Sequence, residues 1–294
     1  MKVAVFGSVH KKGFADACRE LIAALSDKQV SMCFESGVAA FLQTQQVSLP
    51  GESTLLQIGE NWQADMAFSL GGDGTFLKTA DAVGSREIPI FGINLGHLGF
   101  MVDVSGDEIT TAINEIFANG YTTEPRSVLC LSKRTSDGLE HIGHALNEVA
   151  LLKVDSSSMI KVHTVVDGEY LCTYRADGLI VATPTGSTGY SLSVGSSIMA
   201  PQNKSLILSP VAPHSLNQRP VVIPDEWSIS LEVESRNGSF LVSLDGRSRE
   251  MSAGERLLIT KAPYSIMVAK RRGHTYFQTL RDKLMWGVDV RTDK

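Results

Sequence analysis

The residues best suited to chemistry lie in a glycine-rich segment, Gly71-Gly-Asp-Gly-Thr75, which follows the apolar run 66–70. Glycines let phosphate oxygens approach backbone N–H groups without a Cβ in the way, and the positive end of a following helix favours an anion. The carboxylate of Asp73 would repel a phosphate unless it binds a metal ion or accepts a proton from an attacking hydroxyl. The pattern therefore predicts phosphoryl transfer, with a simple helix cap by Asp73 as the alternative.

This segment differs from the common nucleotide-binding patterns. No Gly-Lys-Ser/Thr follows the glycines, as a Walker P-loop requires, and the spacing is not GxGxxG. A second glycine-rich stretch, residues 92–100 (GINLGHLGF), follows the apolar run 89–93. Because open α/β sheets bind ligands at the carboxyl ends of their strands, both stretches are expected at that edge. Taken alone, Asn94 and His97 are interpreted as residues that form hydrogen bonds within the loop.

Three polar segments in the second half could bind a nucleotide. Asn147-Glu148 enters an apolar run, which indicates either exposure at a strand's edge or hydrogen bonds to a polar ligand, with Glu148 suited to ribose hydroxyls. Arg175 and Asp177 fall on one face of an extended chain, where a salt bridge between them is the alternative. Residues 183–193 (TPTGSTGYSLS) are dense in hydroxyls and glycines, and Tyr190 could lie against a base or sugar. This last segment is not a GxSxG nucleophile elbow.

The elements that must position these residues change character near Pro125. Before it, apolar runs alternate with helical patterns at 14–25 and 107–118, which is typical of a parallel sheet covered on both faces. After it, short β-rich runs are separated by tight-turn dipeptides at Asp167-Gly168, Asn237-Gly238 and Asp245-Gly246. Helical spacing returns at 275–286.

Three parts are therefore predicted along the chain. Residues 1–125 form an α/β domain with a Rossmann-like parallel sheet and the glycine loop. Residues 126–270 form a β-rich, β-sandwich-like domain. Residues 271–294 form a carboxyl-terminal helix and a loose tail, and the helix packs back on the first domain.

Composition excludes several classes of function. The 294 residues are 43% hydrophobic and 20% charged, with a formal net charge of −5, unlike proteins that coat nucleic acids. No stretch reaches the roughly 18 apolar residues that cross a bilayer, and MKVAVFGS at the start is too short for a secretory signal. The four cysteines are scattered without a CxxC pair. We expect reduced thiols, a cytoplasmic location, no nucleic-acid or membrane partner, and no metal site made by the protein alone.

Together, these segments resemble the NAD kinase family in content, order and spacing. The matching segments are GGDGTFL at 71–77, GINLGHLGF at 92–100, NE at 147–148, RADG at 175–178 and TPTGSTGYSLS at 183–193. GGDGT alone is shared with diacylglycerol and sphingosine kinases, whereas its combination with NE and GSTGYSLS is highly specific. The resemblance covers nearly the whole chain.

The resemblance implies that the chain uses ATP to phosphorylate the 2′-hydroxyl of the adenosine ribose of NAD, giving NADP. ATP would carry Mg²⁺ or Mn²⁺ on its phosphates, and NAD would bind in the crevice between the two domains. A homodimer or homotetramer is also implied, in which neighbouring copies complete the site.

The resemblance also implies roles for individual residues. Asp73 would accept the proton of the 2′-hydroxyl with Gly74 beside it, and Lys78 would lie near the phosphates. The nicotinamide side would contact Asp177, Arg175 and Ala212. The adenosine part would contact a larger set, namely Asn147, Glu148, Thr185, Thr188, Gly189, Tyr190, Ser191, Leu192 and Ser193.

Two positions depart from the family pattern, and several questions stay open. Gly189 stands where alanine is usual, and Arg247 stands where many bacterial members have glutamine, which leaves a role for residue 247 and the choice between NAD and NADH open. A lipid kinase would use the same Gly-Asp-Gly motif, but this alternative does not explain the NE and GSTGYSLS segments. A non-catalytic NAD-binding sensor would not need Asp73. Lys11 and Lys12 are candidates for the donor phosphates, with ordinary surface lysines as the alternative.

Overall fold

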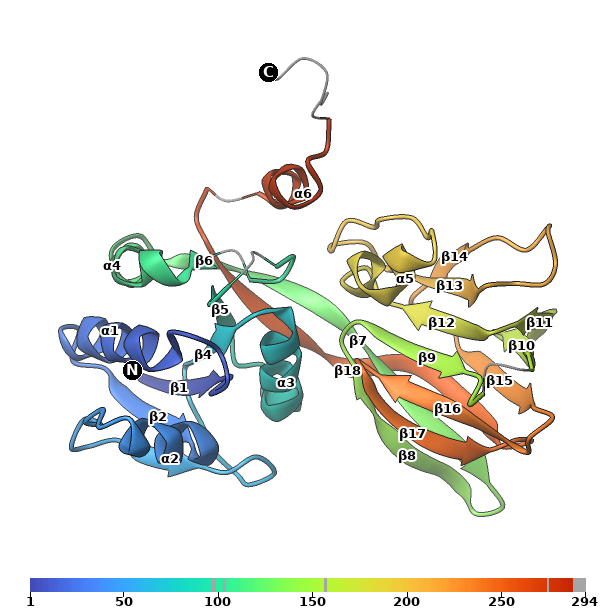
Figure 1. The fold of residues 1–294 in the computed structure, drawn as a ribbon, viewed down its shortest axis with the longest axis horizontal. Helices are drawn as coiled ribbons and strands as arrows, with labels where there is room; N and C mark the ends of the chain where they lie inside the picture. Colours follow the sequence, from blue (N-terminus) through green and yellow to red (C-terminus); the bar gives the residue numbers. More distant parts are fainter. Residues whose placement is uncertain (97–98, 103, 156–157, 274, 288–294) are drawn as a thin grey trace. The chain divides into compact units, whose positions relative to one another are not determined.

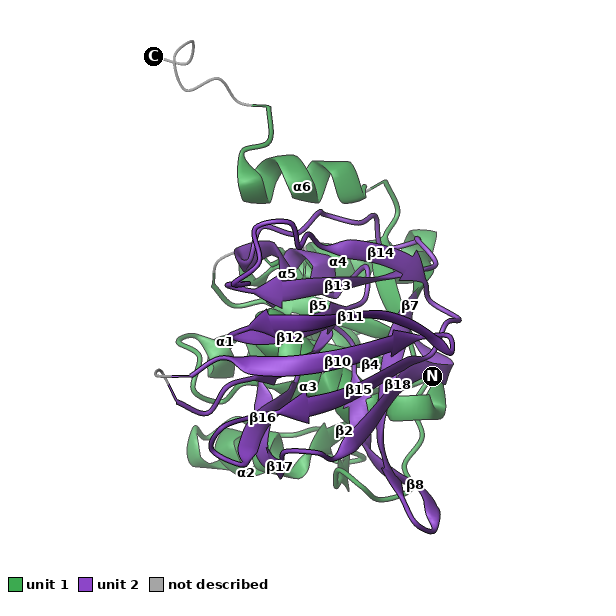
Figure 2. Cartoon of the chain, turned by 90° about the vertical axis from the view of Figure 1, so that its right-hand side faces the viewer, with its two compact units in different colours: residues 1–125, 266–294 green, residues 126–265 purple. Residues whose placement is uncertain are grey.

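In the computed structural model, the described residues (1–96, 99–102, 104–155, 158–273 and 275–287) form two compact units (Figure 1, Figure 2). Unit 1 comprises Met1–Pro125 and the chain from Ile266 onward, and unit 2 comprises Arg126–Ser265. The long strands β7 (Tyr121–Thr135) and β18 (Arg256–Arg271) each begin in one unit and end in the other. No helix within the described ranges is long and apolar enough to cross a membrane.

Unit 1 is built on a parallel sheet with the strand order β3-β2-β1-β4-β5. Strands β4 and β5 are buried along their whole length, as expected for central strands covered on both faces. The end of β18 and the short β6 also pair parallel to β5. The predicted Rossmann-like sheet is confirmed, and β2 and β3, which the sequence analysis did not identify, extend it. The strands are β1 (Lys2–Gly7), β2 (Ser31–Glu35), β3 (Thr54–Leu56), β4 (Met66–Gly71), β5 (Ile90–Asn94) and β6 (Val104–Ser105).

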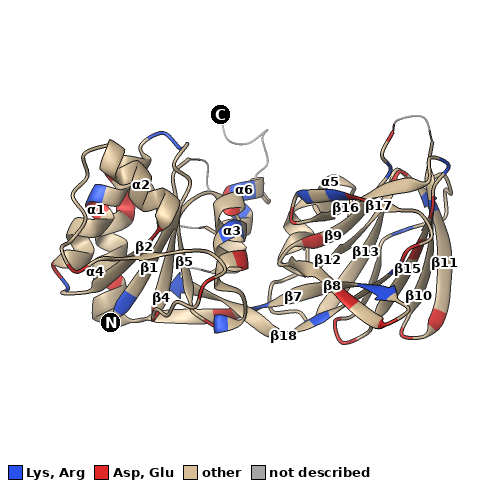
Figure 3. Cartoon of the chain, turned by 90° about the horizontal axis from the view of Figure 1, so that it is seen from below, with Lys and Arg blue, Asp and Glu red and all other residues tan. Residues whose placement is uncertain are grey.

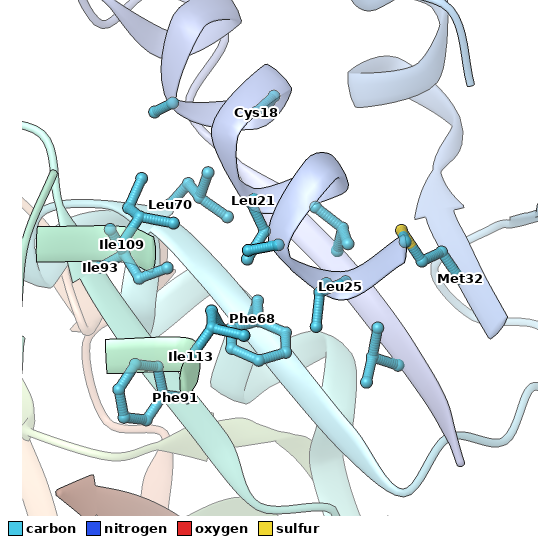
Figure 4. Packing of buried hydrophobic residues seen from close by; sticks show 14 of the residues in the cluster. Cys18, Leu21, Leu25, Met32, Phe68, Leu70, Phe91, Ile93, Ile109 and Ile113 are labelled. Atoms are coloured by element: carbon cyan, nitrogen blue, oxygen red, sulfur yellow. The ribbon is translucent and has the colours of Figure 1, made fainter. Parts of the chain in front are cut away.

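Helices cover the two faces of this sheet. Helix α1 (Phe14–Ser26), α2 (Ser36–Thr44) and α4 (Ile109–Asn119) share one core cluster with strand residues such as Phe68 (Figure 4). Side chains alternate along a strand, so the neighbour Ser69 points to the other face. There its hydroxyl lies 2.9 Å from that of Thr79 in α3 (Asp73–Val83). A 3₁₀ turn, η2 (Gly106–Glu108), precedes α4, so the α-helix begins two residues later than predicted.

Unit 2 is a β-sandwich of two antiparallel sheets whose apolar side chains meet in one cluster. One sheet has the order β14-β13-β12-β9-β16-β17, with β9 (Glu148–Leu152), β12 (Gly178–Ala182), β13 (Ser205–Val211), β14 (Val221–Pro224), β16 (Ser239–Leu244) and β17 (Arg247–Ser252). The other contains β8 (Gly138–Ala145), β10 (Ile160–Val166), β11 (Glu169–Ala176) and β15 (Ile229–Glu234), with the unit 2 parts of β7 and β18.

Two of the three predicted tight turns, Asp167-Gly168 and Asp245-Gly246, have the backbone expected of a hairpin. Asp167 and Asp245 have φ of 48° and 49°, and a glycine of positive φ follows each of them. Two consecutive left-handed residues form the turn that matches the twist of a two-residue hairpin. The hairpins β10–β11 and β16–β17 are thereby confirmed.

Charged residues of both signs are scattered over the strands of unit 2 (Figure 3). They form cross-strand pairs, including Lys161 with Glu234 and Arg256 with Glu232. Solvent screens such exposed pairs, so they add little to stability, and the sandwich depends on its apolar core. The remaining helical elements are η1 (Gly84–Arg86), η3 (Gly186–Thr188), α5 (Tyr190–Ser193) and α6 (Tyr276–Leu284), and α6 belongs to unit 1.

Candidate functional site

The carboxylate of Asp73 bridges the two glycine-rich stretches of unit 1. Asp73 is the first residue of α3, but it does not cap that helix, because the N-cap position belongs to Gly72. Its Oδ2 accepts a hydrogen bond from the N–H of Phe100 at 2.9 Å, and its Oδ1 accepts one from Met101 at 3.2 Å. A carboxylate oxygen has a second lone pair, so each oxygen can still accept a hydroxyl proton. The cap interpretation of Asp73 is therefore wrong.

Two glycines make this arrangement possible. A Cβ at Gly99 would lie 1.8 Å from Oδ1 of Asp73, and a Cβ at Gly71 would lie 2.1 Å from Oγ1 of Thr75. Any larger side chain at either position would displace Asp73 or Thr75. Gly74 differs from both, because nothing lies within 4 Å of a Cβ built there. The fold of the chain therefore does not require glycine at position 74, and the space over the first turn of α3 is open there.

A hollow of about 660 Å³ opens in unit 1 beside Asp73. The loops after β1 and β4 line it, and these adjacent strands lie where the strand order reverses direction. Open α/β sheets bind ligands at this topological switch point. The first N–H groups of α3 face no carbonyl of their own helix and suit an anion. Lys11 and Lys78 are both exposed and line the hollow, whereas Lys12 does not line it.

In unit 2, antiparallel pairing brings two distant segments together. Glu148 at the start of β9 pairs with Ala182 at the end of β12, so Asn147 lies beside the segment that begins at Thr183. The N–H of Thr183 donates to the carbonyl of Asn147 at 2.9 Å, and its hydroxyl donates to that of Leu146 at 2.6 Å. A Cβ at Gly186 would lie 2.1 Å from the carbonyl oxygen of Asn147. Only glycine allows this close approach.

Asp245 fixes the Asn147-Glu148 corner, and the sequence analysis had identified it only as a turn residue. Its carboxylate accepts hydrogen bonds from three consecutive N–H groups, those of Leu146, Asn147 and Glu148, at 2.7, 2.8 and 3.1 Å. The left-handed backbone of Asp245 in the β16–β17 turn aims the side chain at this corner. The dipeptide Asp-Gly predicts the turn but says nothing about which amides the carboxylate will reach.

Three buried oxygen atoms at this corner have no hydrogen-bond partner among the described residues: Oδ1 of Asn147, Oε2 of Glu148 and Oγ1 of Thr185. A buried polar atom without a partner costs about 1–3 kcal/mol. Glu148 and Thr185 are only 8% and 6% exposed, so solvent satisfies little of this need. Such a cluster is typical of a site that a polar ligand completes.

The electrostatics of the corner are dominated by two acids, the buried Glu148 and the partly buried Asp245. Burial, together with the nearby Asp245 carboxylate, raises the pKa of Glu148 to about 7, against the lowering effect of the hydrogen bond from the N–H of Tyr190. Burial also raises the pKa of Asp245, against the lowering effect of its backbone donors and of Arg247. Glu148 can therefore serve as either a hydrogen-bond donor or an acceptor near neutral pH.

The other predicted residues of the 183–193 segment differ in orientation. Tyr190 is 37% exposed, so part of its side chain is accessible to a ligand. Ser191 is buried, and its hydroxyl lies 3.2 Å from that of Ser209. Thr188 donates to the carbonyl of Thr185 at 3.1 Å. Leu192 is partly buried, and Gly189 and Ser193 are at least partly exposed.

The predicted nicotinamide-side residues lie at the opposite end of β12. Asp177 precedes this strand, and its carboxylate forms an ion pair with Lys153 at 2.8 Å rather than with Arg175. The N–H of His214 donates to the carbonyl of Arg175, and Ala212 has a φ of 44°. Because a strand rises about 3.3 Å per residue, Asp177 and Thr183 are separated by roughly 20 Å. One chain thus presents two separate groups of candidate residues.

The two departures from the family pattern have visible surroundings. A Cβ at Gly189 would lie 3.0 Å from Oε2 of Glu148, so alanine there would press on that carboxyl. Arg247 donates to the carbonyls of Leu244 and His144. His97 of the second glycine stretch lies outside the described residues.

Comparison with known proteins agrees with these features. Residues 3–121 match the family model of the ATP-NAD kinase N-terminal domain, and residues 146–270 match that of the ATP-NAD kinase C-terminal domain. The chain is 48% identical over 294 residues to an NAD kinase of Bacteroides fragilis, covering 99% of this chain and 100% of that protein. It is 40% identical over 290 residues to an NAD kinase of Porphyromonas gingivalis, covering 99% of each.

Solved structures show the same architecture. Yeast NADH kinase complexed with NADH matches with a TM-score of 0.88 at 25% identity, over 100% of this chain and 90% of that chain. An NAD kinase from Archaeoglobus fulgidus in complex with ATP matches with a TM-score of 0.72 at 26% identity, over 97% of this chain and 99% of that chain.

The raised pKa of Glu148 predicts a pH-dependent stability. The folded protein holds the proton of the Glu148 carboxyl more tightly than the unfolded chain does. The stability that this proton contributes is therefore fully present below pH 4.5 and is lost as the pH rises to about 7. Glu148→Gln cannot ionise. We expect the fall in the free energy of unfolding between pH 5 and pH 8 to be smaller in this variant by about 2–3 kcal/mol. Urea unfolding at the two pH values measures it, with the exposed Glu226→Gln as control. Equal pH dependence in Glu148→Gln and wild type would contradict the assignment.

Proposed function

The chain belongs to the ATP-NAD kinase family and is an NAD kinase, and we propose that Asp73 is the general base of its reaction. The 2′-hydroxyl of the adenosine ribose loses its proton to the Asp73 carboxylate as the hydroxyl oxygen attacks the γ-phosphorus of ATP. The bond from that phosphorus to the bridging oxygen of ADP breaks, and the proton passes to solvent. The observation that supports this role is the carboxylate held by two backbone N–H groups at a glycine-rich loop.

The donor phosphates are proposed to bind in the unit 1 hollow. Its exposed lysines, Lys11 and Lys78, offer positive charge beside the amino end of α3. Gly74 leaves open space over the same turn, where a phosphate oxygen can approach the backbone.

A divalent cation fits this donor site as a partner of ATP rather than as a resident of a protein cage. The carboxylates that line the hollow are those of Asp73 and Glu35, and both already accept backbone N–H groups. Mg²⁺ commonly binds through substrate phosphates with few protein ligands, and there it neutralises the charge of the transferred group. Mg²⁺ or Mn²⁺ therefore enters with ATP in this proposal.

The adenosine part of NAD is proposed to complete the corner of unit 2. Ribose hydroxyls and adenine nitrogens can supply the missing partners of Asn147, Glu148 and Thr185. The exposed ring of Tyr190 offers a surface against which the base or sugar can lie.

The residues at the other end of β12 are proposed to serve a neighbouring copy. Asp177, Arg175 and Ala212 lie roughly 20 Å from the adenosine corner of their own chain. In a homodimer or homotetramer they would supply the nicotinamide side of the neighbour's site, which makes the assembly part of the active enzyme.

Asp73→Asn tests the base directly. Turnover of NAD with ATP and Mg²⁺, read through an NADP-specific dehydrogenase, is expected to fall about 10²- to 10⁴-fold, because a positioned base is lost. NAD affinity measured by calorimetry should stay near the wild-type value. Asp81→Asn, an exposed carboxylate of the same helix, serves as control. Wild-type turnover in Asp73→Asn would rule out the general-base role. Running the assay with NADH as well settles the acceptor preference.

Asn147→Ala tests the adenosine corner. Losing a buried hydrogen-bonding group costs about 1–3 kcal/mol, so the dissociation constant for NAD should rise roughly 5- to 150-fold. Asn203→Ala, an exposed asparagine of the same unit, should leave it unchanged. Equal affinity in Asn147→Ala and wild type would remove this corner from the site.

The same variant tests the shared site. In a mixture with Asp177→Ala, half of the randomly formed dimers are mixed, and each carries one intact site. About a quarter of the wild-type activity should then return. If mixing restores nothing, the two groups do not act across copies.

Lys11 and Lys12 form a matched pair for the donor site. Because only Lys11 lines the hollow, Lys11→Ala should raise the KM for ATP about 10-fold or more, the effect of losing a charged hydrogen bond. Lys12→Ala should change it less than about twofold, since exposed charges act weakly at a distance. Equal effects of the two substitutions would argue against the hollow as the donor site.

A further inference from the structure

A cysteine and two histidines gather on the β7–β8 hairpin, and none of the three side chains belongs to the sites proposed above. Sγ of Cys130 lies 3.5 Å from Nδ1 of His141, and the rings of His141 and His144 are 4.5 Å apart between centroids. One ligand atom from each of the three side chains lies within 4.8 Å of the others. Among the described residues, this is the one group of three or more His, Cys, Asp or Glu side chains with metal-binding spacing.

A β-bulge creates the cluster. Residues three apart on a regular strand point to opposite faces, which would separate His141 from His144. Here Cys130 pairs with His144, but the register shifts after Leu131, so that His141 pairs with Ser132. The extra residue, Ile142, packs toward the core of the sandwich. Both histidines therefore lie on the outer face together with Cys130.

We propose that Cys130, His141 and His144 bind one divalent transition-metal ion, with Zn²⁺ as the ion that their chemistry favours. Zn–S and Zn–N bonds of about 2.3 and 2.0 Å in a tetrahedron place sulfur and nitrogen about 3.5 Å apart, which matches the distance from Cys130 to His141. The wider separations, up to 4.8 Å, close with small side-chain rotations. Sulfur and imidazole ligands discriminate against Mg²⁺, so this site differs in kind from the ATP-bound cation.

The surroundings allow entry of the ion and an open coordination position. His141 is exposed, and Cys130 and His144 are partly exposed, so the ligands are accessible from solvent. Three protein ligands leave the fourth tetrahedral position to water or an outside ligand. The thiol binds as a thiolate, so its proton is released to the buffer on binding.

Metal binding at this place would act on a segment that leads into the adenosine corner. His144 lies three residues before Asn147, and Arg247 donates a hydrogen bond to the backbone carbonyl of His144 at 3.1 Å. An ion bound by side chains of β7 and β8 would link the two strands next to the bulge. The bound form should therefore unfold at a higher temperature, since a ligand that binds only the folded state stabilises it.

Co²⁺ is the probe, because it replaces Zn²⁺ and is coloured. The full-length protein, purified in a chelator and then freed of it, is titrated with Co²⁺ under reducing conditions. We expect one Co²⁺ ion to bind per chain and to give a thiolate-to-Co²⁺ charge-transfer band in the near ultraviolet. One equivalent of Zn²⁺ should displace the Co²⁺ and abolish the band. Absence of the charge-transfer band at saturating Co²⁺ would overturn the proposal.

Variants assign the ligands. Cys130→Ser should abolish the charge-transfer band, and His141→Asn should weaken Zn²⁺ binding more than about 100-fold, since even outer-sphere partners are worth about 10- to 100-fold. Matched controls are Cys172→Ser and His163→Ala in the same unit, which should keep the wild-type spectrum and affinity. Equal loss in Cys172→Ser, or unchanged affinity in His141→Asn, would place the metal elsewhere. His141 is exposed, so its variant remains informative if Cys130→Ser fails to fold.

Discussion

A buried polar atom must find a partner, and the corner of unit 2 leaves several without one. The chain uses Asp245 to satisfy the three N–H groups of residues 146–148. The nearby side-chain oxygens of Asn147, Glu148 and Thr185 stay unpaired. The backbone of the corner is held by the Asp245 carboxylate, and the side-chain acceptors are left for the ligand that we propose. Leaving these oxygens unpaired costs about a few kcal/mol of stability, and the apolar core of the sandwich offsets this cost.

The acid pair at this corner also sets its charge. Two carboxyls in one buried place cannot both ionise freely, and the backbone donors that converge on Asp245 favour ionisation there rather than at Glu148. A corner that binds ribose hydroxyls, as we propose, needs a hydrogen-bond acceptor but gains nothing from two neighbouring negative charges. The raised pKa of Glu148 eases that conflict.

Unit 1 meets a different requirement, which is to hold a carboxylate at the site that we propose for the phosphates. The parallel sheet ends its strands at one edge, and the order reversal between β1 and β4 opens a hollow there. Asp73 is drawn toward the N–H groups of Phe100 and Met101, and Gly99 makes room for it. The carboxylate is thus positioned by the second glycine stretch, which accounts for the presence of two such stretches in one domain.

Much of this protein could be predicted from its sequence. Apolar runs that alternate with helical patterns predict the parallel sheet, and Asp-Gly dipeptides predict the hairpin turns, because both depend on local periodicity and backbone preference. The sequence likewise predicts the polar chemistry of Asp73, Glu148 and the 183–193 segment, because this chemistry depends on residue types and on their neighbours in the chain. The kinase family follows from these motifs together.

Other features depend on contacts between residues far apart in the chain, which local patterns do not encode. Asp245 lies 97 to 99 positions from the amides that it binds, and only the pairing of β16 with β9 brings them together. The extended strand β12 separates Asp177 from Thr183 by its whole length, although both residues belong to one motif-rich stretch. Cys130, His141 and His144 show no metal-binding spacing in the sequence. The register shift that turns both histidines to one face exists only once β7 and β8 have paired, because a bulge is a property of two strands and not of one.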